Sequence, residues 1–232
     1  MKKPPGDLAV VTGASRGIGR ATALAFAKRG VRVALVGRSA TLLEETAESA
    51  RSAGADARAF VCDVAIEDDV VRMAGDVLRA MGTPRIVVNN AGIVRRGVTV
   101  DGTTSADWDE VIATNLRGPF LVSRAFLPSM LDAKRGRLVH VASISATLGS
   151  PGAASYAASK WGLVGLAKSL AEELRGKGVQ SIAVLPGSVD TDMLVGSGFD
   201  PRMSADDVAG LIVYAGLDAP DALHGSAVEV FG

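Results

Sequence analysis

The chain has 232 residues, enough for one α/β domain with a substantial core. Its 25 basic and 25 acidic residues balance and form no basic stripe, so we expect no nucleic-acid partner. No apolar run approaches the length needed to span a bilayer, so we expect no membrane partner. Residues 1–6 are charged and lack the apolar centre of a signal peptide, which favours a cytoplasmic location.

Cys62 is the only cysteine, so an internal disulfide is excluded and a reducing compartment fits best. It follows an apolar run, and we interpret it as a buried core thiol rather than a nucleophile. The two histidines, His140 and His224, lie far apart in the sequence with no supporting cluster of metal ligands. We predict structural histidines and no metal site, although His224 could approach the mouth of a substrate site.

Short apolar runs alternate with helical patterns along the chain. We expect strands near residues 7–12, 32–36, 57–61, 85–89, 137–143, 179–185 and 226–230. We expect helices near residues 17–29, 40–53, 67–81, 105–132, 155–176 and 204–216. This alternation predicts parallel strands joined by right-handed crossovers. The predicted fold class is therefore α/β: a Rossmann-like, doubly wound parallel sheet in a single domain over residues 1–232, with a short substrate-loop region near 188–203.

A glycine-rich turn, Gly13-Ala-Ser-Arg-Gly17-Ile-Gly19, follows the first expected strand and opens an alanine-rich helix. Strand, glycine turn and helix in this order are typical of a dinucleotide-binding site. The glycines let the backbone approach a pyrophosphate, and the helix N-terminus attracts it. The spacing differs from the commoner G-x-G-x-x-G. A plain surface turn is the alternative, but the three glycines fall where strand gives way to helix.

The second expected strand ends at Gly37-Arg38, where sites for NAD usually carry an acid that binds the ribose 2′-hydroxyl. Arg16 lies inside the glycine turn, and two guanidinium groups suit a 2′-phosphate. We therefore predict NADPH rather than NADH, with a solvated Arg38 as the alternative. Asp63, after the third strand, could bond the adenine amino group. Residues 89–92, Asn-Asn-Ala-Gly, would pass close beneath a cofactor, and an asparagine amide there can tie neighbouring strands together.

Tyr156 and Lys160 lie four residues apart on an expected helix, so their side chains share one face. A neighbouring ammonium favours the phenolate and lowers the pKa of a phenol, which suits proton transfer to or from a carbonyl or alcohol. Ser143 ends an expected strand, and its hydroxyl could hold the same carbonyl oxygen. Tyr-x-x-x-Lys alone is common on ordinary helices, and its combination with the glycine turn makes it informative.

Together these motifs resemble those of the short-chain dehydrogenase/reductases from about residue 7 to residue 193. The matching elements are TGxxxGxG at 12–19, NNAG at 89–92, Asn115, Ser143, Tyr156-x-x-x-Lys160 and PGxxxT at 186–191. The resemblance implies hydride transfer between a nicotinamide cofactor, NADP(H), and a carbonyl or alcohol. Within the family, the likeness is to 3-oxoacyl-thioester reductases, those acting on acyl-carrier-protein substrates in fatty-acid synthesis.

The resemblance also implies a role for individual residues. Tyr156 would be the general acid in reduction and the base in oxidation, while Lys160 would bond the nicotinamide ribose and lower the pKa of Tyr156. Ser143 would polarise the carbonyl, Asn115 would hold a water linking Lys160 to solvent, and Thr191 would bond the nicotinamide carboxamide. The predicted cofactor-binding residues are Gly13, Ser15, Arg16, Gly17, Ile18, Gly19, Arg38, Asp63, Val64, Asn90, Ala91, Gly92, Tyr156, Lys160, Pro186, Gly187, Val189 and Thr191.

The leading hypothesis is an NADPH-dependent reductase of a small-molecule ketone, such as a 3-oxoacyl thioester. An NAD-linked alcohol dehydrogenase and a catalytically silent nucleotide-binding regulator are the alternatives. The segment 194–203 is shorter than the substrate-covering helices that the resemblance implies, so we expect an open pocket. The helix carrying Tyr156 is apolar on several sides, and with the resemblance this predicts a homodimer or homotetramer paired through that helix.

Overall fold

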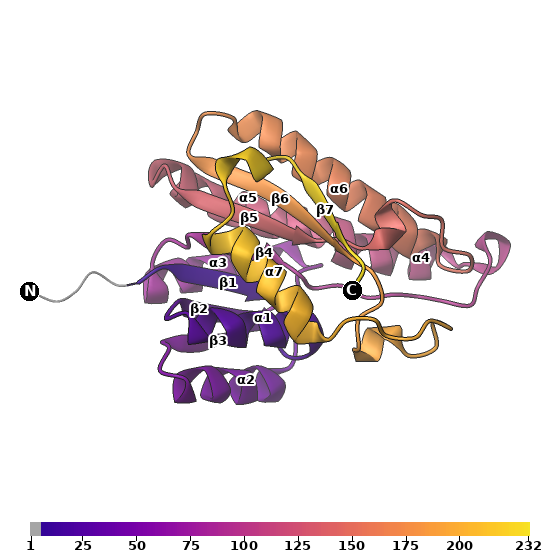
Figure 1. The fold of residues 1–232 in the computed structure, drawn as a ribbon, viewed down its shortest axis with the longest axis horizontal. Coiled ribbons are helices and arrows are strands. Elements are labelled where there is room, and N and C mark those ends of the chain that lie inside the picture. Colours follow the sequence, from indigo (N-terminus) through magenta and orange to yellow (C-terminus); the bar gives the residue numbers. More distant parts are fainter. Residues whose placement is uncertain (1–5) are drawn as a thin grey trace, which may run out of the picture.

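A central twisted sheet carries helices on both of its faces (Figure 1). The computed structural model describes residues 6–232, so residues 1–5, on which the signal-peptide expectation partly rests, lie outside it. The seven strands of this region are all parallel, in the order β3-β2-β1-β4-β5-β6-β7, which confirms the predicted α/β class. Their bounds are β1 Leu8–Thr12, β2 Arg32–Gly37, β3 Ala57–Val61, β4 Ile86–Asn89, β5 Gly136–Val141, β6 Val179–Pro186 and β7 Ala227–Val230.

The helices separate the strands and cover the sheet in two layers. They are α1 Gly17–Lys28, α2 Ala40–Ser52, α3 Glu67–Met81, α4 Ser105–Ile112, α5 Gly118–Asp132, α6 Ala154–Leu174 and α7 Ala205–Leu217. On one face α1, α2 and α7 bury Phe26, Leu43 and Ile212 against the strands. On the other, α3 and α5 bury Met73 and Phe126, and α6 packs beside them over β5 and β6. No helix described for residues 6–232 is long and apolar enough to cross a membrane.

Strand β1 illustrates why the strands are continuous apolar runs. All five of its residues are buried. Ala9 and Val11 belong to the core under α1 and α7, whereas Leu8 and Val10 belong to the core under α3 and α5. A parallel strand with helices on both faces has no solvent side, so polar residues have no place to alternate.

The expected helix over 105–132 is continuous in the structure, but it contains a π-helical turn, Ala113–Arg117, that the sequence pattern did not predict. Pro119 accounts for this turn. It has no N–H to donate to the carbonyl of Asn115, four residues earlier, so a regular α-helix cannot be satisfied there. Single π-helical turns of this kind are frequent at functional sites. The helix places Asn115 in the middle of this turn, fully buried.

Cys62 and His140 are buried, as the sequence predicts. Burial raises the pKa of the Cys62 thiol to about 12, so the thiol is protonated and a poor nucleophile. The His140 ring lies on β5 with Nδ1 3.3 Å from Asn89 Nδ2, and its exposed fraction is 0%. Both side chains therefore act as parts of the core.

The buried His140 imidazole predicts a loss of stability in mild acid. Burial lowers its pKa from 6.5 to about 4, so the unfolded chain takes up a proton at a higher pH than the folded chain. The contribution of the neutral imidazole to the free energy of unfolding is fully present above pH 6.5. It is lost progressively as the pH falls toward 4, by an amount on the order of 1–3 kcal/mol. Urea unfolding at several pH values, for the wild type and His140→Gln, measures it. The substitution should flatten the profile in this window; an unchanged profile would assign the loss to carboxylates.

Candidate active site

The carboxyl ends of the parallel strands gather most of the predicted site residues at one edge of the sheet. Gly13 follows β1, Asn90 follows β4 and Ser143 lies two residues beyond β5. Pro186 ends β6, and Asp63 lies two residues beyond β3. Such an edge is where open α/β sheets bind their ligands.

The glycine turn between β1 and α1 has the shape that a pyrophosphate needs. Gly13 and Gly17 have φ values of +67° and +52°, which L side chains rarely adopt. A Cβ on Gly19 would lie 2.1 Å from the carbonyl oxygen of Gly13, so only glycine fits. Arg16 is the N-cap of α1 but its side chain does not cap the helix, and the first turn carries no acid. The free N–H groups there can receive an anion, and the residues present fit a dinucleotide.

Thr12, which ends β1, holds the glycine turn against the neighbouring strand. Its Oγ1 donates to the Val88 carbonyl at 3.2 Å and accepts from the N–H groups of Asn90 and Ala91, each at 3.0 Å. The Asn90 amide donates to the Thr12 carbonyl at 2.9 Å, so an asparagine does tie two strands together as expected. Thr12 was not among the predicted site residues, although its place in TGxxxGxG is a sequence signal for it.

The two arginines predicted for a 2′-phosphate face carboxylates in this structure. Arg38 Nη1 lies 3.8 Å from Asp63 Oδ2, and Arg16 Nη1 lies 3.3 Å from Asp192 Oδ2. Both guanidinium groups are exposed and therefore accessible to a ligand. Exposed ion pairs are weak, so a phosphate with two charges can compete for these groups. Val64, beside Asp63, is instead buried against the start of α5.

Ser143, Tyr156 and Lys160 come together beneath this edge, all buried. Lys160 Nζ donates to the Val141 carbonyl at 2.8 Å and lies 5.6 Å from the centre of the Tyr156 ring. A Cβ on Gly92 would lie 3.6 Å from the same Nζ, so the lysine faces the NNAG segment as well. The helical spacing of Tyr156 and Lys160 therefore does place them on one face of α6.

The expected acidification of the Tyr156 phenol is wrong for this structure. Burial raises its pKa, while a hydrogen bond with Ser143 and the positive charge of Arg96 oppose that shift. Burial also lowers the pKa of Lys160 to about 8, so the lysine is still mainly an ammonium near neutral pH but lies closer to its titration range. The reason is desolvation, which the spacing of two residues on a helix does not reveal.

Asn115 is bonded through its whole side-chain amide. Its Oδ1 accepts from the N–H of Ile93 at 2.8 Å, and its Nδ2 donates to the Ile93 carbonyl at 2.8 Å and to Ser159 Oγ at 3.0 Å. These bonds join the π-helical turn to the segment after β4 and to α6. Ser159 was not predicted, because a serine inside a helix carries no distinctive pattern.

Two loops pack against Tyr156: residues 93–104, through Ile93 and Val94, and residues 144–153, through Ala153. A third segment, residues 187–204, is joined to the first by the bond from Arg96 to the Met193 carbonyl. Thr191 contacts the glycine turn, since a Cβ on Gly17 would lie 3.3 Å from its Cγ2. Val189 is buried and pairs with Met203, and Gly187 donates its N–H to the Val230 carbonyl at 2.8 Å. The Val189–Met203 pairing folds the 187–204 segment back on itself, and the Gly187 bond ties its start to the end of β7.

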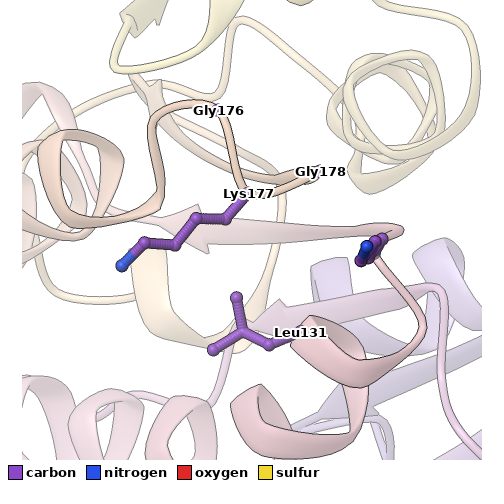
Figure 2. A pocket seen from close by; sticks show the side chains of 5 residues that line it. Leu131, Gly176, Lys177 and Gly178 are labelled. Carbon is purple, nitrogen blue, oxygen red and sulfur yellow. The ribbon is translucent and has the colours of Figure 1, made fainter.

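His224 does not approach the substrate mouth. Its Nδ1 accepts from the N–H of Ser181 at 3.1 Å, near the amino end of β6, whereas the site is at the carboxyl end. A cavity of about 620 Å³ lies at that same opposite edge. Figure 2 shows Leu131 and Lys177 beside it, with Gly176 and Gly178 forming the turn before β6. Neither feature belongs to the site described above.

With this geometry established, comparison with known proteins is informative. A family model described as short chain dehydrogenase matches residues 7–199, well over half of the chain. This chain belongs to the short-chain dehydrogenase family. Its members are oxidoreductases, and all six sequence elements of the resemblance lie within the matched residues.

Curated relatives of this short-chain dehydrogenase include 3-oxoacyl-acyl-carrier-protein reductases. The FabG protein of Pseudomonas aeruginosa is 38% identical over 188 residues, which is 81% of this chain and 76% of the relative. The reductase of Synechocystis is 36% identical over 222 residues, covering 91% and 90% of the two chains.

Solved structures show the same fold. Levodione reductase is similar with a TM-score of 0.91 and 27% identity, covering 97% of this chain and 95% of the other. A metagenomic short-chain oxidoreductase in complex with NADP is similar with a TM-score of 0.86 and 38% identity, covering 97% and 96%.

Proposed function

We propose that this short-chain dehydrogenase reduces a ketone, such as a 3-oxoacyl thioester, with NADPH as hydride donor and Tyr156 as proton donor. The observation that carries the proposal is the buried group of Ser143, Tyr156 and Lys160 beside Gly92, at the sheet edge that also holds the glycine turn. Tyr156 would supply the acid that reduction needs, and its hydroxyl shares a hydrogen bond with Ser143.

In this mechanism the Ser143 hydroxyl and the Tyr156 hydroxyl both donate hydrogen bonds to the substrate carbonyl oxygen. A nicotinamide held at this edge would supply the hydride. As negative charge grows on the oxygen, Tyr156 would transfer its proton to it, and the two donors would stabilise that charge. The Lys160 ammonium then stabilises the phenolate that remains, since its ring distance of 5.6 Å allows a direct electrostatic effect.

Lys160 and Asn115 would return a proton to Tyr156. Lys160 donates one N–H to the Val141 carbonyl, and its other N–H groups would donate to the nicotinamide ribose and to a water. The side chain of Asn115 is fully bonded, so the water that the resemblance assigns to Asn115 would bind its main-chain carbonyl, which Pro119 leaves without an α-helical donor. The pKa of about 8 for Lys160 suits such a relay near neutral pH.

The glycine turn and the residues beside it would bind the cofactor. Gly13, Ser15, Gly17, Ile18 and Gly19 would meet the pyrophosphate at the N-terminus of α1. Asp63 and Val64 would lie along the adenine side, Asn90, Ala91 and Gly92 beneath the ribose, and Pro186, Gly187, Val189 and Thr191 along the nicotinamide. Arg16 and Arg38 would exchange their carboxylate partners for the 2′-phosphate.

Arg38→Asp tests the cofactor assignment. We expect kcat/KM with NADPH to fall roughly 10- to 100-fold, because a charge-assisted bond to phosphate is replaced by repulsion, while NADH is affected little. Steady-state kinetics with both cofactors measure the change in preference. Arg58→Asp is the control, since Arg58 pairs with Asp56 at the far end of β3 and should leave the preference unchanged. An unchanged preference in Arg38→Asp would leave Arg38 as a solvated cation.

The proposal includes one domain over residues 1–232 and a cytoplasmic homodimer or homotetramer paired through α6. The exposed Trp161 on that helix supports pairing, with 55% of its surface accessible in the single chain. A large apolar side chain at that exposure is a candidate for burial between subunits. Light scattering of the wild type and Trp161→Glu would measure the oligomeric state.

The first experiment is NADPH oxidation, followed by absorbance, with an acetoacetyl thioester and with NADH in parallel. Turnover with NADPH alone supports the reductase assignment. Turnover with NADH alone favours the NAD-linked alcohol dehydrogenase. Cofactor binding without turnover on a panel of ketones favours the silent nucleotide-binding regulator.

A further inference from the structure

Two consecutive arginines in the loop after β4 differ in what neutralises them. Arg95 lies 3.5 Å from Asp107 and forms a second ion pair with Glu110. Arg96 has no carboxylate within 4.0 Å among the residues that the structure describes. Its Nη1 donates instead to the main-chain carbonyl of Met193. A guanidinium has five N–H donors, so this bond leaves most of its binding capacity unused.

Arg96 lies where the loops around Tyr156 meet. It follows Gly92 by four residues, and its bond to Met193 connects the 93–104 loop to the 187–204 loop. The next residue, Gly97, lies against the 144–153 loop, where a Cβ on Gly152 would be 3.3 Å from its backbone nitrogen. Arg96 is half-buried, in contrast to the exposed Arg95.

The charge of Arg96 reaches the proposed proton donor. Tyr156 is packed against Ile93 and Val94, just before Arg96 in the chain, and the positive charge of Arg96 acts against the rise in the tyrosine pKa. The acid next to Met193, Asp192, pairs with Arg16 on the glycine turn and not with Arg96. A half-buried guanidinium with no carboxylate partner among residues 6–232 has N–H donors available for an anion.

We propose that Arg96 binds an anionic group of the substrate, a carboxylate or a phosphate, and thereby selects ketones that carry one. This rests on the proposed function and deepens it, since it adds a property of the substrate. A carboxylate or phosphate accepts two parallel N–H bonds from a guanidinium, which fixes the orientation of the substrate as well as its affinity. The bond to Met193 holds the guanidinium in place for this contact.

The test compares charged and uncharged ketones in four proteins: wild type, Arg96→Gln, Arg96→Lys and Arg95→Gln. The substrates are acetoacetate, its uncharged ethyl ester, and the acetoacetyl thioesters of N-acetylcysteamine, which is uncharged, and of coenzyme A, which carries phosphates. For Arg96→Gln we expect kcat/KM to fall roughly 10- to 100-fold on the charged substrate whose anion Arg96 binds, either acetoacetate or the coenzyme A thioester. The kcat/KM values for the uncharged substrates and the KM for NADPH should stay nearly unchanged. Arg96→Lys should recover part of the loss, because it keeps the charge but not the paired geometry.

The pattern identifies the source of the anion. A loss confined to acetoacetate assigns a carboxylate near the ketone, and one confined to the coenzyme A thioester assigns a phosphate. Arg95→Gln should leave the ratio of charged to uncharged substrates as in the wild type. Equal losses on all substrates would make Arg96 a brace between loops and overturn the proposal, as would no loss on any. Arg96→Lys also covers the case in which Arg96→Gln does not fold.

Failure of the proposed function would be seen separately, as absence of turnover by the wild type on all four ketones, charged and uncharged. The same protein with NADP⁺ bound is then titrated with acetoacetate and with the ethyl ester in a calorimeter. Acetoacetate binding that Arg96→Gln weakens and Arg95→Gln does not supports the anion site without any reaction. Equal binding by wild type and Arg96→Gln overturns it.

Discussion

Replacing Tyr156 with phenylalanine is expected to lower kcat by roughly 10²- to 10⁴-fold, the usual contribution of a general acid, while NADPH binding changes little. The substitution removes one hydroxyl from a buried ring that packs against Ile93 and Val94, so the surrounding structure is preserved. It removes the proton donor and one of the two hydrogen bonds to the carbonyl oxygen. Steady-state kinetics measure the first effect, and fluorescence titration with NADPH the second.

Tyr214→Phe is the matched control, because Tyr214 is the second tyrosine of the chain and lies exposed on α7. It should keep the activity of the wild type. A Tyr156→Phe protein that turns over near the wild-type rate would remove Tyr156 from the mechanism. A protein that loses NADPH binding as well as turnover would show that the ring's hydroxyl supports the cofactor site rather than proton transfer.

Gly19→Ala is expected to produce the second large effect, on both stability and cofactor affinity. The added Cβ would lie 2.1 Å from the Gly13 carbonyl oxygen and 2.5 Å from Asn90 Nδ2. Backbone atoms at that distance cannot give way cheaply, so we expect a loss of roughly 1–3 kcal/mol of unfolding free energy or more. Moving Gly13 away from α1 also spoils the cradle for the pyrophosphate, and NADPH affinity should fall roughly tenfold or more.

Gly210→Ala is the control for Gly19→Ala, since it also places an alanine inside a helix. A Cβ on Gly210 meets nothing within 4 Å, so the change should stabilise α7 by roughly 0.5–1 kcal/mol and leave cofactor binding unaltered. Thermal unfolding and NADPH titration of both variants give the comparison. If the two variants behave alike, the close approach of Gly19 to Gly13 has no importance for the fold.

The strands and most helices could be predicted from local pattern. A parallel strand covered on both faces is a continuous apolar run, as in Leu8–Thr12, and a helix such as Glu67–Met81 carries its own apolar stripe and acidic first turn. The π-helical turn inside the helix over 105–132 was the exception. It depends on Pro119 and on the bonds of Asn115 to Ile93 and Ser159, which lie elsewhere in the chain.

The location of the site residues could be predicted as well, because parallel strands bring all of their carboxyl ends to one edge of the sheet. That reasoning identifies Ser143, Asn90 and Pro186 without coordinates. The same reasoning does not predict ion-pair partners, because the spacing of residues cannot show that Arg16 faces Asp192 and that Arg38 faces Asp63. It also misplaces His224, whose loop closes on the opposite edge.

The α/β class, the dinucleotide-binding turn and the residues of the family resemblance could be predicted from the sequence alone. These follow from periodicity, from glycine positions and from short spacings, all of which are local properties of a chain. The direction of the Tyr156 pKa shift, and the lack of a carboxylate partner for Arg96 among residues 6–232, became visible only in the fold. Both depend on burial and on which loops meet, and desolvation is a property of the folded surroundings that no run of residues contains.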